Sequence, residues 1–321
     1  MKKQHFFSFV LATLSFVAAK SLEEVGVENY YYQKATNFYK EDGYFDLIHP
    51  TEVNLLPMGV SSFSDLTSMD STHLVGIEPN SGDVVFLDLI DYSISSKLSL
   101  GSDHKFVAVS KIDSTLILMD SESKVYFLLP PYDVNSFASS INTKENFNSV
   151  GICLHQSTKR LFLISEVQEK EEGQFSSFLY AFNLNRNQLK DEPIFEINST
   201  DIETFALNNN LSLPITFVTN SGDTIQGLDF NPSAIAVHPK TNEIYILSST
   251  DRSLIVYNQF GEIVNYTTLD SSIFPKPTGM TFQENGDLLI SNSELLNPSI
   301  VKLKWNKLYQ SLEGHGLIFG R

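Results

Sequence analysis

Short stretches of alternating apolar and polar residues recur along most of this chain. Two of them, residues 74–77 and 84–87, flank the polar stretch 78–83. That stretch contains the Pro, Asn and Gly that a tight hairpin turn requires. The pattern predicts antiparallel strands joined by short turns rather than helices.

Further strands are predicted in the C-terminal half. Residues 244–247, 254–257 and 263–266 are apolar runs, and residues 258–261 (NQFG) form a turn before the last of them. The apolar run 288–291 follows another polar turn. Strands of this length at short intervals are typical of an all-β domain.

The strand pattern repeats with an almost constant period. Counting one equivalent position in each repeat gives gaps of 46, 45, 83 and 45 residues. These positions are Gly59, Lys105, Val150, Ser233 and Thr278. A period near 45 with short strands predicts a β-propeller. Because the gap of 83 is close to two periods, we expect one disguised repeat and six blades in all.

A propeller ring has to close so that no sheet edge stays exposed. Residues 44–48 alternate like a strand near the start of the repeats, and residues 300–305 do so at their end. We therefore expect the N-terminal and C-terminal strands to pair and close the ring.

One segment, residues 199–211, interrupts the strand rhythm. Thr200 and Glu203 have the spacing of a capping box, which marks the start of a helix. Ile202, Phe205 and Ala206 give the segment one apolar face. We expect a short helical insertion within the disguised repeat.

The N-terminus has the features of a signal peptide. Lys2 and Lys3 precede an apolar run over residues 6–17, and small residues follow it. The predicted organisation is a signal peptide at 1–19, a linker at 20–43, a propeller at 44–305 and a C-terminal tail at 306–321. This predicts a secreted, periplasmic or envelope-associated chain with no membrane span after cleavage.

Composition narrows the classes of partner. The chain has 321 residues and a formal net charge of −16, so it should repel nucleic acid backbones. Its single cysteine, Cys153, cannot form an internal disulfide and lies in an apolar strand pattern, which predicts a buried thiol. We expect a monomer.

Motifs for catalysis are not found in the sequence. The seven histidines are scattered without the spacing of metal ligands, and no nucleophile elbow is present. His155 and His238 follow the first strand of their repeats, which predicts a structural role in a turn. No catalytic residue, metal ligand or cofactor is predicted from these patterns.

Two stretches carry a family resemblance. The run at residues 231–249, NPSAIAVHPKTNEIYILSS, and the run FPKPTGM at 274–280 resemble motifs of the SdiA-regulated (YjiK/CarP-like) β-propeller family. The resemblance covers roughly residues 44–305 and is specific over 227–294. It implies an exported or envelope-associated propeller of six blades. Some members are linked to calcium responses.

The departures from this family concern the starts of the inner strands. The family has Glu at most of these positions, where the side chains would surround the central channel and could bind a cation. Here they are Gly59, Lys105, Val150 and Thr278. We expect a calcium site in the channel to be lost or weakened, unless the alignment slips at Gly59 and Lys105.

Three functions stay open at this level. We favour a non-enzymatic propeller that binds a small ligand or an envelope protein at its channel mouth. The candidate ligand-binding residues are Lys105, Ser233, Thr278, Asn292 and Glu294. The alternative is a calcium-dependent hydrolase, a lactonase-like enzyme or a phytase-like phosphoesterase. The third is a structural envelope protein that assembles through blade edges or its Tyr-rich N-terminal arm.

Overall fold

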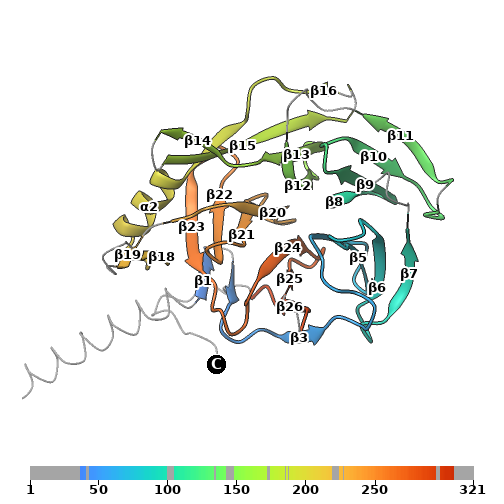
Figure 1. Cartoon of the computed structure of the whole chain (residues 1–321), viewed down its shortest axis with the longest axis horizontal. Coiled ribbons are helices and arrows are strands. Elements are labelled where there is room, and N and C mark those ends of the chain that lie inside the picture. The colour runs from blue at the N-terminus through green and yellow to red at the C-terminus, as the bar shows by residue number, and fades with distance from the viewer. Residues whose placement is uncertain are drawn as a thin grey trace, which may run out of the picture.

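The chain forms a ring of antiparallel sheets (Figure 1). The computed structural model describes residues 37–40, 43–99, 105–133, 135–141, 148–171, 174–184, 186, 188–218, 224–226, 228–293 and 297–306. Within these residues, five of the sheets are the blades of an all-β β-propeller, and two further sheets are two-stranded hairpins. The predicted signal peptide, most of the predicted linker and nearly all of the predicted tail lie outside the described residues.

Blades 1 and 2 are regular four-stranded sheets. Blade 1 contains, from the channel outward, β4 (Asp65–Ser68), β5 (His73–Ile77), β6 (Val84–Asp88) and β7 (Ile94–Leu98). Blade 2 contains β8 (Phe106–Ile112), β9 (Thr115–Asp120), β10 (Val125–Leu128) and β11 (Phe137–Ile141).

Blade 3 is larger because its third strand is long. Its inner strands are β12 (Ser149–His155) and β13 (Arg160–Ser165), followed by β15 (Gln174–Asn183). The short strand β14 (Gln168–Glu171) follows β13 along the same edge of β15. Two other short strands, β16 (Gln188–Leu189) and β17 (Phe195–Asn198), pair with the outer edge of β15.

Blades 4 and 5 complete the ring. Blade 4 contains β20 (Pro232–Val237), β21 (Ile244–Ser248), β22 (Ser253–Tyr257) and β23 (Ile263–Thr268). Blade 5 contains β24 (Pro277–Phe282), β25 (Leu288–Asn292) and β26 (Ser299–Leu303), and its outermost strand is β3 (Glu52–Leu55).

The expected sixth blade is not present among the described residues. The inner strands β12 and β20 contact each other directly, so blades 3 and 4 are neighbours. The 83-residue gap is filled by the long blade 3, by helix α2 (Ser199–Asn208) and by a hairpin of β18 (Ile215–Val218) and β19 (Thr224–Gln226). The expectation of six blades was wrong because an insertion, not a repeat, supplies the extra length.

Helix α2 confirms the predicted helical insertion. Ile202 and Ala206 of its apolar face are buried in the core between blades 3 and 4. The cap differs from the expected one, because Asn198 accepts a hydrogen bond from the amide of Thr200 at 2.8 Å. Asn is among the preferred residues at this position.

The N-terminal strand that joins the last blade is β3, and it lies later in the sequence than expected. It pairs with β26 in antiparallel register, with Val53 opposite Val301. Residues 44–46 instead belong to β2 (Gly43–Asp46), which forms a hairpin with β1 (Asn37–Lys40). The end of the predicted linker is therefore a strand. Tyr44 makes one isolated bridge to Asn306 beyond β26.

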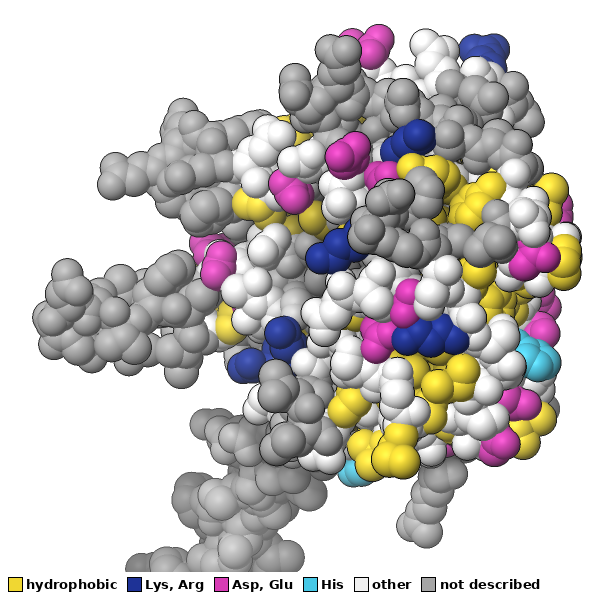
Figure 2. All heavy atoms as spheres, turned by 45° about the vertical axis from the view of Figure 1, so that its right-hand side comes forward, with side chains coloured by type: hydrophobic (Ala, Val, Ile, Leu, Met, Phe, Trp, Pro, Cys, Tyr) yellow, Lys and Arg dark blue, Asp and Glu magenta, His cyan; other side chains and the backbone are white. Residues whose placement is uncertain are grey.

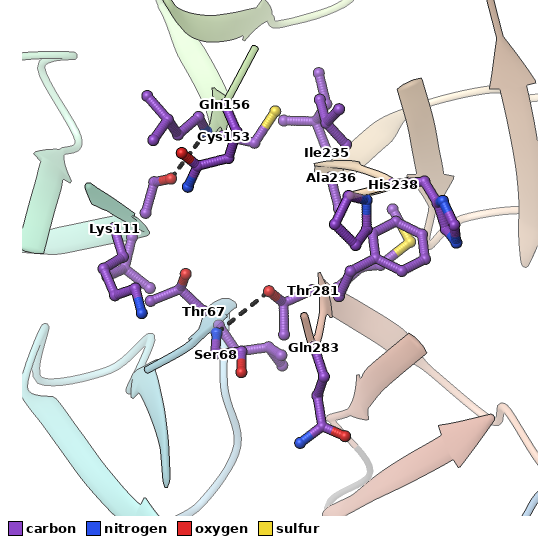
Figure 3. Close-up of a pocket in the computed structure, with 18 of the residues that line it drawn as sticks. Thr67, Ser68, Lys111, Cys153, Gln156, Ile235, Ala236, His238, Thr281 and Gln283 are labelled. Atoms are coloured by element: carbon purple, nitrogen blue, oxygen red, sulfur yellow. Dashed lines mark hydrogen bonds between the residues drawn. The ribbon is translucent and has the colours of Figure 1, made fainter. Parts of the chain in front are cut away.

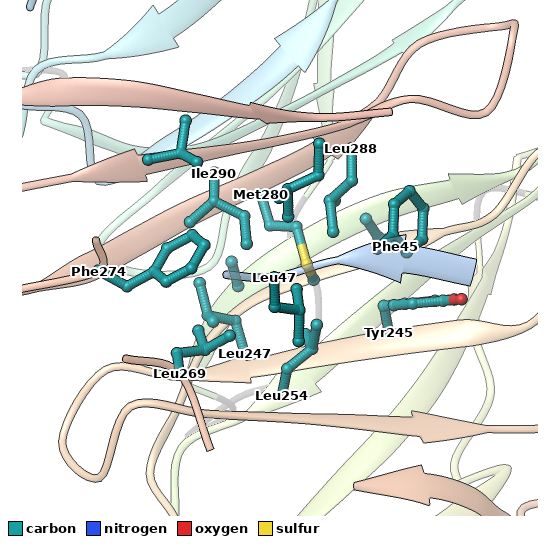
Figure 4. Close-up of a cluster of buried hydrophobic side chains, with 14 of the residues drawn as sticks. Phe45, Leu47, Tyr245, Leu247, Leu254, Leu269, Phe274, Met280, Leu288 and Ile290 are labelled. Atoms are coloured by element: carbon teal, nitrogen blue, oxygen red, sulfur yellow. The ribbon is translucent and has the colours of Figure 1, made fainter. Parts of the chain in front are cut away.

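The hairpin contributes to the core between blades 4 and 5. Figure 4 shows Phe45 and Leu47 among side chains of both blades. Trp305 packs against this hairpin, with its ring centroid 4.8 Å from that of Phe45. An apolar wedge of this kind stabilises the neighbouring blades by removing apolar surface from water.

The surface reflects the acidic composition without a single acidic patch on the face viewed. Figure 2 shows Asp and Glu side chains dispersed among neutral, basic and hydrophobic ones where blades 1 and 2 come forward. No helix in the described part of the chain is long and apolar enough to cross a membrane.

Candidate functional site

Inner strands β8, β12, β20 and β24 each begin with one extra residue. The extra residues are Val107, Val150, Ser233 and Thr278, where the pairing register with the second strand shifts. Ser64 occupies the equivalent place in blade 1, directly before β4. We call these five the bulge residues. A bulge re-aims a side chain, and all five line one cavity at the mouth of the channel.

The bulge residues correct the expected register in two blades. Val150, Ser233 and Thr278 are equivalent, as the repeat predicts. In blades 1 and 2 the equivalent residues are Ser64 and Val107, not Gly59 and Lys105. The alignment slips there because Gly59 lies in a turn with φ +99° before the blade, a conformation that suits glycine. None of the five bulge residues is a carboxylate.

The cavity at the bulge residues has a volume of about 920 Å³, and we call it the wide cavity. Its wall combines uncharged polar residues with apolar ones, among them Phe63, Val107 and Val150. Hydroxyl side chains line it from all five blades or the segments before them: Ser61, Ser62, Ser64, Ser121, Ser149, Ser233, Thr278 and Ser293. Two charged residues, Glu166 and Lys276, also line it, and both are exposed.

A second cavity, the narrow cavity, lies where the inner strands end. Its volume is about 430 Å³. Figure 3 shows Thr67, Gln156 and Thr281 turned toward the opening, with His238 at the margin. An apolar layer also contributes to its wall: Leu66, Val109, Ile152, Ile235 and Met280.

Side chains satisfy several amides on the free edges of the inner strands. Such an edge faces the channel and has no further strand to pair with. Three hydrogen bonds join neighbouring blades at this level: Val109 N donates to Asp65 Oδ2 at 3.0 Å, Leu154 N to Ser110 Oγ at 3.0 Å, and Ser68 N to Thr281 Oγ1 at 3.3 Å. These bonds join blade 1 to blade 2, blade 2 to blade 3, and blade 5 to blade 1.

Asp65 is the unusual member of this layer. The equivalent residues in the other blades are Ala108, Gly151, Ala234 and Gly279. Asp65 is 2% exposed. Burial raises the pKa of its carboxyl well above the usual value, although hydrogen bonds from the amides of Val109 and Leu66 oppose the shift.

The raised pKa of Asp65 predicts a specific pH dependence. Because the folded protein holds this proton to higher pH than the unfolded chain, the contribution to stability is complete below about pH 4 and is lost as the pH rises. Asp65→Asn should remove this dependence. We expect the stability of the wild type relative to the variant to fall as the pH is raised from about 4 toward neutrality, measured by urea unfolding. A constant difference across this range would contradict the assignment.

The two histidines of the repeats have the predicted structural role. His155 Nδ1 lies 2.6 Å from Thr158 Oγ1, and His238 Nδ1 lies 3.2 Å from Thr241 Oγ1. Both therefore organise the turn after an inner strand. Cys153 is 7% exposed and lines the narrow cavity, and burial raises the pKa of its thiol.

The predicted ligand-binding residues do not all come together. Ser233 and Thr278 line the wide cavity. Lys105 is exposed before β8 and lines neither cavity. Asn292 is fully buried within blade 5, where its amide donates to the carbonyl of Ile273 at 3.1 Å. Glu294 lies outside the described residues.

Sequence reasoning missed several residues of the wide cavity. Ser64 lies in the segment that the repeat pattern aligns on Gly59. Glu166 follows β13, and Lys276 precedes β24. Counting backwards from the apolar residues of each inner strand, rather than from the preceding turn, would have found Ser64. Among the described residues, no group of three or more His, Cys, Asp or Glu side chains is placed to hold a metal ion.

Comparisons with known proteins identify the fold. The chain matches no protein-family model and no curated protein. The glutaminyl cyclase of Myxococcus xanthus matches with a TM-score of 0.52 and 11% identity, over 81% of this chain and 97% of that chain. A streptogramin B lyase matches with a TM-score of 0.45 and 13% identity, over 79% of this chain and 97% of that chain. The likeness to the cyclase shows the propeller fold and nothing of its chemistry.

Proposed function

We propose that this protein binds a small polar ligand in the wide cavity and does not catalyse a reaction on it. The observation that carries the proposal is the convergence of five bulge residues on one cavity of about 920 Å³. A concave site with polar groups held by a rigid scaffold is the usual form of a ligand site.

The composition of the wall favours binding over hydrolysis. A calcium-dependent hydrolase of the kind considered above needs several oxygen ligands from carboxylates. The bulge residues supply none, and Glu166 is the carboxylate that lines the wide cavity in the described part of the chain. Hydroxyls and one exposed carboxylate are better suited to hydrogen bonding than to activating water.

Export and family membership are part of the same proposal. The basic and apolar N-terminal segment supports a signal peptide and an envelope or extracellular location. The run at 231–249 supports membership of the SdiA-regulated family. The ligand would then be a molecule of the periplasm, the envelope or the surroundings of the cell.

Filling the wide cavity tests the proposal. Ser121 is exposed and lines the cavity, so Ser121→Trp should block it without disturbing the core. Ser96→Trp is the matched control, because Ser96 is exposed on β7 and lines neither cavity. In a saturation-transfer NMR screen of sugars, amino acids, diamines and short peptides, we expect ligands that bind wild type and Ser96→Trp but not Ser121→Trp.

Two results of this screen would contradict the proposal. One is the absence of any ligand for the wild-type protein. The other is a set of ligands that bind Ser121→Trp as well as they bind wild type, because they would occupy a different part of the surface.

A further inference from the structure

Three of the bulge residues carry a hydroxyl, and each of these hydroxyls donates a hydrogen bond within the protein. Ser64 Oγ donates to the carbonyl of Val107 at 2.9 Å, and Thr278 Oγ1 donates to the carbonyl of Phe63 at 2.6 Å. Ser233 Oγ donates to the carbonyl of Leu247 at 3.3 Å. A carbonyl oxygen has no proton, so the hydroxyl is the donor in each of these bonds.

Two further hydroxyls of the wall also donate hydrogen bonds within the protein. Ser149 Oγ donates to the carbonyl of Ile164 at 2.9 Å. Ser61 Oγ donates to Glu78 Oε1 at 3.1 Å. Burial alone would raise the pKa of Glu78, but hydrogen bonds from Lys97 and Ser61 outweigh it and lower the pKa. The carboxyl of Glu78 is therefore ionised near neutral pH and can only accept.

A serine or threonine hydroxyl has one proton and two lone pairs. Once the proton is committed to the protein, the oxygen offers only acceptor positions to a ligand. Five hydroxyls of the wide cavity, spread over blades 1, 3, 4 and 5 or the segment before blade 1, therefore act as acceptors. A ligand group that is itself only an acceptor finds no side-chain donor at the bulge residues. It would have to bind to Lys276, to the amides of Asn80 and Asn231, or to the hydroxyls of Ser62, Ser121 and Ser293, which also line the cavity.

The charges around the cavity add to this preference. Glu166 accepts a hydrogen bond from Asn148 at 3.2 Å and leaves acceptor positions free at the wall. Lys276 adds one exposed positive charge to the wall, which partly offsets the negative charge of Glu166. The net charge of −16 makes the surroundings favourable to cations.

We infer that the wide cavity selects ligands that bind through their own N–H or O–H donors, organic ammonium groups above all, and that it discriminates against carboxylates. This inference rests on the proposed function, because it names the chemistry of the ligand at the same site. The protein acts as a receptor for an amine or a polyamine rather than for an organic acid.

Three probes of equal length test the inference. 1,5-diaminopentane, 1,5-pentanediol and glutarate share a five-carbon chain and differ in their end groups. In titration calorimetry at neutral pH and low salt, we expect the diamine to bind at least about tenfold more tightly than glutarate, since unpaired acceptors are costly. The affinity for the diol should lie between the affinities for the diamine and for glutarate.

Substitutions of the two charged residues sharpen the test. Glu166→Gln should weaken binding of the diamine by about threefold, and Lys276→Gln should strengthen it by a similar factor, as expected for exposed charges. Both changes should be small for the neutral diol. Ser121→Trp should abolish binding of the diamine, whereas Ser96→Trp should leave it unchanged.

The outcomes separate this inference from the proposed function. Glutarate binding more tightly than the diamine, and losing its binding in Ser121→Trp, would overturn the inference and keep the cavity as a ligand site. Diamine binding that survives Ser121→Trp would overturn both. If the diamine does not bind the wild type, the inference is overturned, and the screen described above decides the proposed function alone.

Discussion

Replacing Trp305 with alanine is expected to lower the free energy of unfolding by about 3–5 kcal/mol. Trp305 is 7% exposed and joins the end of the last blade to the N-terminal hairpin. Its ring centroid lies 4.8 Å from that of Phe45 and 4.5 Å from that of His238. Removing it leaves a cavity where residues far apart in sequence meet.

The same experiment needs an exposed aromatic residue as its control. Phe260 is 76% exposed at a turn of blade 4, so Phe260→Ala should change stability by no more than about 0.5 kcal/mol. Both variants are compared by urea unfolding monitored by circular dichroism. Equal effects of the two substitutions would show that the hairpin does not stabilise the ring.

The second large effect is expected at Gly279, on the inner strand of blade 5. An added Cβ would lie 2.9 Å from the Cα of Asp65 in blade 1 and 2.9 Å from Ser291 Oγ. The backbone of the neighbouring blade cannot move aside cheaply. Gly279→Ala should therefore destabilise the protein by about 1–3 kcal/mol.

Gly151 is the matched control, because it occupies the equivalent position in blade 3. An added Cβ there would meet its nearest neighbour, Ile235, at 3.4 Å, which is ordinary contact. Gly151→Ala should be neutral, or stabilising by about 0.4–1 kcal/mol through the unfolded chain. A greater loss of stability in Gly151→Ala than in Gly279→Ala would contradict the tighter packing at Gly279.

The strands and the fold class followed from local pattern. The runs at 74–77, 84–87, 244–247 and 254–257 are all strands of the structure. Alternation and turn chemistry are local properties, so a single sequence expresses them. The helix at 199–208 was predicted for the same reason, since its apolar face and start signal lie within a few residues.

The blade count could not be read from spacing. A gap of 83 residues fits two repeats or one repeat with an insertion, and only the contact between β12 and β20 decides between them. The strand that joins the last blade was misplaced because residues 44–48 and β3 both alternate, and pairing with β26 depends on the whole ring.

The candidate site was predicted in part, at Ser233 and Thr278. Its chemistry depends on contacts between blades. Ser64 Oγ donates a hydrogen bond to the carbonyl of Val107. Thr278 Oγ1 donates one to the carbonyl of Phe63, which is 215 residues away in the sequence. No local pattern shows that a hydroxyl is a committed donor. Asp65 was missed for a similar reason, because its amide partner Val109 belongs to the next blade.

A crystal structure of the protein with 1,5-diaminopentane would show where the ligand binds. We expect the diamine inside the wide cavity, with its ammonium groups against Glu166 and the oxygens of bulge residues such as Ser64 and Ser233. Diamine ordered in the narrow cavity or on the outer surface, with the wide cavity holding only water, would contradict this expectation.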